Sequence, residues 1–115
     1  MNLEELKAKA EAATPGPWAV HPNRPYSVDS IEGDGELAVY VCTTGGWADC
    51  DVPNAAFIAA ANPQTVLALV KVAEAAEAVR LAASDRATPL QIREARILGA
   101  RTALWDALNE LEAME

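Results

Sequence analysis

Apolar residues recur along the chain with more than one spacing, and each spacing predicts a different kind of element. Over about 3–13 they recur every three or four positions, which predicts an N-terminal helix. Asn2 and Glu5 stand at the two positions of a capping box, which favours a helix start there. The run 14–17, Thr-Pro-Gly-Pro, ends this helix, because proline removes a backbone donor and restricts the residue before it.

Between 18 and 52 the apolar period falls to two, which is typical of strands with one buried face. Leu37, Val39 and Val41 alternate with residues of the opposite face, and glycine-rich turns bound this segment on both sides. The predicted strands are about 26–31, 36–43 and 47–52, with 18–20 as an additional fourth strand at the edge. The pattern therefore predicts a small antiparallel meander of three or four strands.

The C-terminal half returns to helical spacing. Asn62 is a helix cap followed by proline at the first helical position, which predicts a helix over 63–84. Thr88 and Gln91 repeat the capping box and predict a helix over 89–114. Two long helices joined by about four residues return antiparallel. We therefore predict an α+β fold in a single domain. Its parts are an N-terminal helix (1–14), a β-meander (18–52), a short helix (54–61) and a helical hairpin (63–114), which together span 1–115.

Composition limits both the core and the partners. Of the 115 residues, 25 are Ala, so the apolar fraction buries little area per residue and the predicted core is thin. Self-association is a natural supplement to such a core, and we expect a homo-oligomer. The net charge of −8 disfavours binding to DNA, RNA or an anionic membrane.

No targeting or metal-binding pattern stands out. The N-terminus is acidic where a secretory signal is basic, and the Ala-rich stretch 64–84 carries regularly spaced charges that exclude a membrane span. We therefore expect a cytoplasmic protein. Cys42 and Cys50 with the lone His21 fall short of a zinc pattern, so no metal and no cofactor is expected. A disulfide between the two cysteines and a pair of buried thiols both remain open.

The helical wheel of 89–114 places Arg101 inside an apolar arc. Glu77 falls inside the corresponding arc of the preceding helix, and Glu74 lies at its edge. A charge in an apolar seam is expensive unless it is paired. Three interpretations follow: an internal ion pair of Arg101 with either glutamate, an anion site in which Arg93 or Arg96 helps Arg101 to hold a phosphate, or an Arg101 side chain that reaches past the edge of the seam into water.

The remaining chemistry is sparse. Trp18 and Trp105 fit core positions, whereas Trp47 beside a Gly-Gly turn is the better candidate for stacking on a ligand. Arg24 could help to hold a phosphate there if the fold brings it close to Trp47. His21 with Asp29, Asp49 or Asp51 could form an acid/base pair. The chain has no nucleophile elbow and no glycine-rich phosphate loop, so we expect no catalytic residues and no enzyme.

Two segments carry a resemblance to a known family. Residues 12–18 read Ala-Ala-Thr-Pro-Gly-Pro-Trp, and residues 54–63 read Asn-Ala-Ala-Phe-Ile-Ala-Ala-Ala-Asn-Pro before a leucine-rich helix. This order of motifs resembles the Ead-like family of small bacteriophage accessory proteins. The family pattern has a polar or acidic residue before the Phe, where this chain has Ala56. The resemblance implies a phage origin and a non-essential role directed at the host.

A looser similarity of architecture connects the chain to phage proteins that defeat Thoeris immunity by sequestering a cyclised ADP-ribose messenger. It implies a non-catalytic anti-defence sponge, with Arg101 on the pyrophosphate, Phe57 or Trp47 on the adenine and Asn62 on a ribose or base edge. The partner is then a small nucleotide-derived ligand. The alternative hypothesis is an acidic interaction module that inhibits or redirects a host protein through its helical hairpin.

Overall fold

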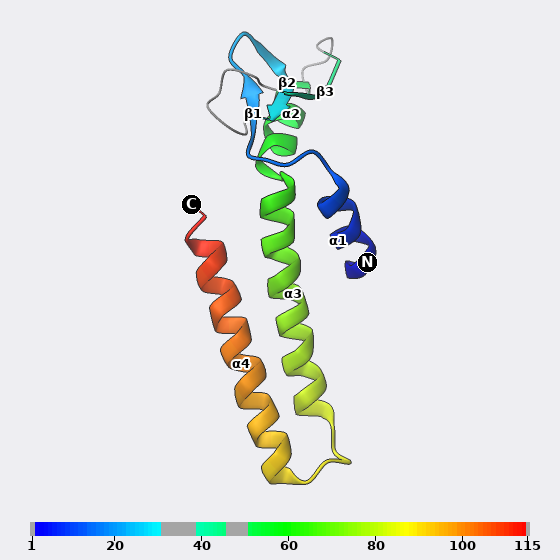
Figure 1. Ribbon diagram of the computed structural model, residues 1–115, viewed down its shortest axis with the longest axis vertical. Helices are drawn as coiled ribbons and strands as arrows, with labels where there is room; N and C mark the ends of the chain where they lie inside the picture. The colour runs from blue at the N-terminus through cyan, green and yellow to red at the C-terminus, as the bar shows by residue number, and fades with distance from the viewer. Residues whose placement is uncertain (1, 31–38, 46–50, 115) are drawn as a thin grey trace. The chain divides into compact units, whose positions relative to one another are not determined.

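The computed structural model describes residues 2–30, 39–45 and 51–114. The chain divides into two compact units. The N-terminal unit comprises Glu4–Leu67, and the helical unit comprises Ala68–Glu115 together with the first three residues. Figure 1 shows the order of elements along the chain. Helices and an antiparallel sheet occupy separate stretches of sequence, so the predicted α+β class is confirmed.

The N-terminal unit begins with α1, Leu3–Ala12, within one residue of the predicted helix. The turn after it is held by side chains from further along the chain. The indole Nε1 of Trp18 donates to the Thr14 carbonyl at 3.0 Å, and the Ser30 hydroxyl donates to the Pro15 carbonyl at 2.5 Å. These bonds satisfy carbonyls that the prolines leave without helical partners.

The sheet consists of β1 (Trp18–His21), β2 (Arg24–Ser30) and β3 (Val39–Thr43), antiparallel and in the order β1-β2-β3. Val28 in the central strand pairs with Val20 on one side and Cys42 on the other. A two-residue turn, Pro22-Asn23, joins β1 to β2. The backbone amide of Asn23 donates a hydrogen bond to Nδ1 of His21 at 3.1 Å, which stabilises this turn.

The meander was predicted correctly, but its strands were partly misplaced. The optional edge strand 18–20 is a full member, β1, and the predicted strand 47–52 is wrong at its end, since Asp51 begins a helix. Residues 47–50, and the predicted strand positions 31 and 36–38, lie outside the described part of the chain. The short turn at Pro22-Asn23 was not predicted, although proline and asparagine are both common turn residues.

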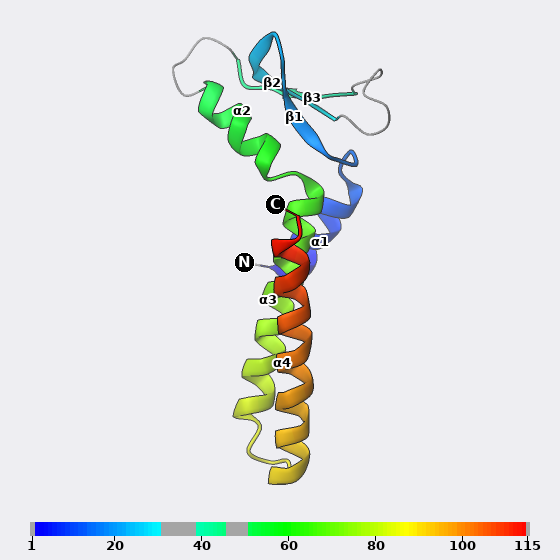
Figure 2. The same cartoon turned by 90° about the vertical axis from the view of Figure 1, so that its left-hand side faces the viewer.

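Helix α2, Asp51–Ala60, covers one face of the sheet (Figure 2). Val28 and Ala55 are fully buried where strand and helix meet, and Ala59 completes the contact. The residues packed around them are Trp18, Val20, Val41, Cys42 and Ile58. The helix starts three residues earlier than predicted, because Pro53 falls in the first turn, where a backbone donor has no helical partner to lose.

The helical unit is an antiparallel hairpin, as predicted, of α3 (Pro63–Ser84) and α4 (Leu90–Glu112), which lie side by side in both views (Figures 1 and 2). Lys71 bridges to Glu110 across it, with an Nζ to Oε2 distance of 2.7 Å. The less exposed positions recur every three or four residues, as in a coiled coil. We call this set the α3–α4 seam; its members are Val72, Ala75, Val79, Ala82, Ile97, Ala100, Leu104, Ala107 and Leu111.

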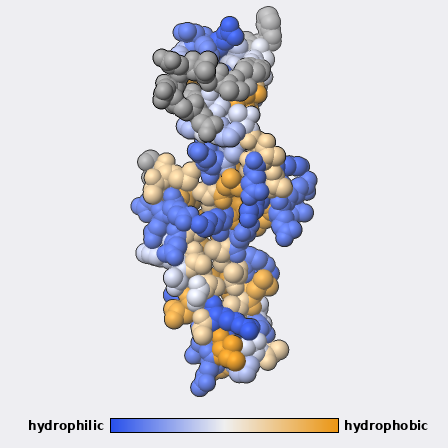
Figure 3. Space-filling view, in the orientation of Figure 1, coloured by the Kyte–Doolittle hydropathy of each residue, from blue (hydrophilic) through white to orange (hydrophobic). Residues whose placement is uncertain are grey.

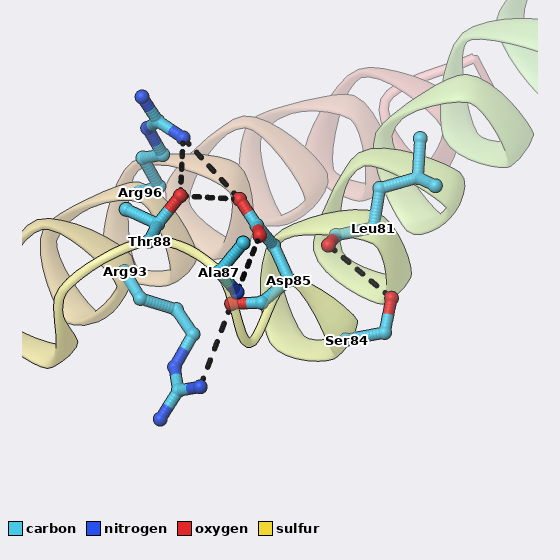
Figure 4. A network of polar contacts seen from close by, with 7 residues as sticks. All are labelled: Leu81, Ser84, Asp85, Ala87, Thr88, Arg93 and Arg96. Atoms are coloured by element: carbon cyan, nitrogen blue, oxygen red, sulfur yellow. Dashed lines mark hydrogen bonds and ion pairs between the residues drawn. The ribbon is translucent and has the colours of Figure 1, made fainter.

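The turn between α3 and α4 is organised by Asp85 (Figure 4). Its carboxylate accepts the Thr88 hydroxyl at 2.5 Å and the Ala87 amide at 3.2 Å, and Arg96 lies 3.6 Å away as an ion-pair partner. The Thr88 hydrogen bond, more than the cation, holds the pKa of Asp85 below its ordinary value. The predicted capping box at Thr88 is therefore wrong: α4 has Pro89 at its N-cap, without a side-chain cap.

The core is as thin as the composition indicated. Among the residues that the structure describes, the buried apolar side chains are those of Ala and Val, together with Pro63. Larger apolar residues lie on the surface instead, and Figure 3 shows them as hydrophobic patches between charged side chains over α3 and α4. Such exposure is informative where several of these residues share one helix face.

Candidate functional site

Arg101 lies on the exposed side of α4, outside the α3–α4 seam. Its predicted place in an apolar seam is wrong, because the apolar arc of α4 is wider than the stripe that α3 covers. Glu77, one of its predicted partners, is held by Arg80 on its own helix, with an Arg80 Nε to Glu77 Oε2 distance of 3.0 Å. This hydrogen bond lowers the pKa of Glu77 and raises that of Arg80. Among the described residues no carboxylate pairs with Arg101.

Arg101 is part of a second stripe on α4. Leu98, Trp105 and Leu108 are 65%, 67% and 43% exposed, and with Arg101 they recur at the same three and four residue spacing as the seam. Each follows a seam position by one residue, so this stripe faces about 100° away from the seam. We call Leu98, Arg101, Trp105 and Leu108 the α4 stripe. Trp105, which the sequence placed in the core, is thus a surface residue.

The centre of the α4 stripe is hollowed. Leu98, Arg101, Thr102 and Trp105 line a shallow depression of about 300 Å³. The Thr102 hydroxyl donates to the Leu98 carbonyl at 3.0 Å, which turns it toward the helix backbone. The lining is therefore mainly apolar with one guanidinium beside an indole ring. Such a surface accepts an apolar or aromatic group that carries a negative charge.

The other predicted site residues belong to the N-terminal unit. Phe57 lies on α2 and is 72% exposed, and Arg24 is exposed at the start of β2. Asn62 caps α3: its Oδ1 accepts the Thr65 amide at 3.1 Å and its Nδ2 donates to the Ala59 carbonyl at 3.2 Å. Trp47 lies outside the described residues. Neither unit by itself brings Arg101 together with Phe57, Asn62 or Arg24.

The two sequence motifs that carry the family resemblance meet in the N-terminal unit. A Cβ built on Gly16 would approach Asn62 Cβ at 3.7 Å and the Gln64 side-chain oxygen at 3.6 Å. The Gln64 amide nitrogen lies 3.5 Å from the Gly16 carbonyl, a long hydrogen bond. A depression of about 250 Å³ lies beside this contact. It is lined by Ala10, Glu11, Ala13, Pro15, Gly16, Pro63, Gln64 and Leu67. The two motifs therefore contact each other through Gly16 and the side chains of Asn62 and Gln64, and this contact has a structural role.

His21 and Asp29 lie near each other on β1 and β2, with 3.9 Å between Nε2 and Oδ2. His21 already accepts the Asn23 amide through Nδ1, and Asp29 is nearly buried. Within the ranges that the structure describes, no group of three potential metal ligands occurs. No helix in those ranges is long and apolar enough to cross a membrane.

The fold defines a small α+β protein in which the two motifs of the resemblance lie in contact within one unit. The chain belongs to the Ead/Ea22-like protein family, whose model matches residues 2–115. The match covers both units, so the resemblance based on two short motifs extends over the whole chain. No curated protein and no solved structure matches the chain. The looser similarity to the ADP-ribose sponges has no counterpart among these comparisons.

Proposed function

We propose that this phage accessory protein acts without catalysis, by binding a host protein through the α4 stripe. The observation that carries the proposal is the exposure of Trp105 and Leu98, each about two thirds, on either side of Arg101. Trp and Arg are the residues most enriched among those that dominate binding energy at protein interfaces. A helix face with apolar residues at this spacing fits a groove on a partner.

The chemistry of the α4 stripe restricts the partner. Leu98 and Trp105 call for an apolar side chain in the depression between them. Arg101, with no carboxylate partner among the described residues, calls for an acidic group opposite it. We therefore expect a host protein that presents an apolar side chain next to an Asp or Glu.

The test is affinity capture from host cells with the full chain, followed by measurement of binding to the purified partner. Ile92 is a matched control because it lies on the same helix, is 49% exposed and stands outside the α4 stripe. Trp105→Ala and Leu98→Ala should each weaken binding at least about tenfold, whereas Ile92→Ala should not. Equal binding by the Trp105→Ala variant would overturn the proposal.

The mass of the complex in solution identifies the occupant of the α4 stripe. A host protein gives a mixed complex. If a second copy occupies the stripe, the purified chain alone has a multiple of its 12.2 kDa mass, and Trp105→Ala lowers the mass of that assembly. That result would support the expected homo-oligomer and count against the host protein as the partner of this surface.

Sequestration of a nucleotide-derived signal is a second candidate. It is favoured by one feature: Arg101 and Trp105 line the same depression, so a guanidinium for phosphate lies beside a ring for a base. A ligand at 100 times its dissociation constant stabilises the native state by about 2.7 kcal/mol. Thermal unfolding with cyclised ADP-ribose isomers should then show a shift that Arg101→Ala removes. Recovery of altered ligand would indicate an enzyme, and no shift would exclude this candidate.

A further inference from the structure

Helix α2 is apolar on the face that the sheet does not cover. Its inner face, with Ala55 and Ala59, is buried against Val28. Its outer residues Pro53, Ala56, Phe57 and Ala60 are all exposed, and Phe57 is the most exposed large apolar side chain of the described chain at 72%. They recur at the i, i+3, i+4, i+7 spacing of a single helix face. We call these four residues the Phe57 face.

The Phe57 face contains one large side chain, the aromatic ring of Phe57, which is exposed to solvent. Its other members are two alanines and a proline, which present little side-chain volume around the ring. None of these three has side-chain rotamer freedom to lose when a partner covers it, so the ordering cost of an interface falls almost entirely on Phe57. A projecting aromatic ring on a rigid, low surface fits an apolar pocket better than a flat interface.

Charge separates this face from the rest of its unit. Positions 52–70 form the longest stretch of the chain without Asp, Glu, Lys or Arg. The N-terminal unit that contains the face has nine acidic and three basic residues, so it carries most of the net charge of −8. A neutral apolar face within a strongly acidic unit attracts a partner that is apolar at the contact and basic around it.

We propose that the Phe57 face is a second docking surface, which inserts Phe57 into an apolar pocket rimmed by Lys or Arg on a host protein. A second copy of the chain fits this face poorly, because it would bring another acidic unit against the first. The surface is separate from the α4 stripe: its residues lie in the other unit, and it selects a partner of opposite rim charge.

The partner is identified by a photoreactive phenylalanine analogue at position 57 in host cells carrying the full chain. The same analogue at position 81 is the control, because Leu81 is also exposed, at 55%, but lies on α3 of the helical unit. The expected result is a crosslinked partner at 57 that is absent at 81. Crosslinks only to a second copy, or the same proteins at both positions, would overturn the proposal.

Binding of the purified partner then tests the mechanism. Phe57→Ala should weaken binding at least about tenfold while Phe57→Tyr retains most of it, and the affinity should fall as salt rises from low to high concentration. Thermal unfolding should show both variants folded, because the ring is exposed. Trp105→Ala should leave this binding unchanged, because Trp105 belongs to the α4 stripe. A negative result for one surface therefore does not decide whether the other surface binds a partner. Binding that is unaffected by Phe57→Ala, or by salt, contradicts the proposal.

Discussion

The side-chain oxygen of Asn62 accepts a hydrogen bond from the backbone N–H of Thr65 at 3.1 Å, in the first turn of α3. The amide nitrogen of the same side chain donates to the Ala59 carbonyl at the end of α2, at 3.2 Å. Asn62 therefore ends one helix and starts the next, and both of its polar atoms are engaged in that role.

Removing this cap should destabilise the chain without changing its surface. Asn62→Ala should lower the free energy of unfolding by about 1 kcal/mol, because a Thr65 donor loses its partner. Asn62→Ser or Asn62→Asp keeps an acceptor at the N-cap and should retain most of the stability. Urea unfolding of the three variants measures the difference. An Asn62→Ala variant as stable as the wild type would show that the side chain is available for a ligand.

Two alanines of α4 test the position of the α3–α4 seam. Ala107 is 1% exposed within it, whereas Ala103 is exposed one turn earlier. Ala107→Leu should cost about 1–3 kcal/mol through overpacking, and Ala103→Leu should change stability by less than about 0.5 kcal/mol. The measurement is the denaturant concentration at the midpoint of unfolding for each variant and the wild type, compared where their m-values are equal. Equal losses at the two positions would place the hairpin contact elsewhere on α4.

Val28 lies at the centre of the core beneath α2, where it is the largest fully buried side chain among the described residues. Val28 is fully buried, so Val28→Ala should cost about 2 kcal/mol from lost burial and the cavity that remains. Val52→Ala is the matched control, since Val52 is a valine in the first turn of α2 and is 46% exposed. Its effect should stay within about 0.5 kcal/mol. Thermal unfolding followed by circular dichroism distinguishes the two.

The turn at Asp85 should make stability depend on pH. The Thr88 hydrogen bond lowers the pKa of this carboxyl below its ordinary value in the folded state. A lowered pKa contributes stability above the unfolded value, and that contribution is lost as pH falls through the folded value. Asp85→Asn should therefore lower Tm at pH 7, and the gap to the wild type should narrow in acid. A gap that is constant between pH 7 and strong acid would exclude the carboxylate as its source.

Local rules predicted the elements whose signals lie within a few residues. Asn62 followed by Pro63 marked the start of α3, and Ser84 its end, because caps and proline act on the adjacent backbone. The strand ending at position 52 was wrong, because a short apolar run fits strand and helix equally and Pro53 is tolerated in a first turn. The Thr88 box failed because Asp85, three residues earlier, engages the same hydroxyl.

The amino-acid sequence by itself determined the fold class, the hairpin, the thin alanine core and the family, since periodicity, capping and motif order are local properties. The sequence did not determine which part of each helix surface is covered by a neighbouring element and which part is exposed. The apolar arc of α4 holds both Leu104 and Trp105, and a wheel treats them alike. Only the packing of α3 decides that Leu104 is covered while Trp105 and Arg101 remain on the surface, because one neighbouring helix covers one stripe and not the whole arc.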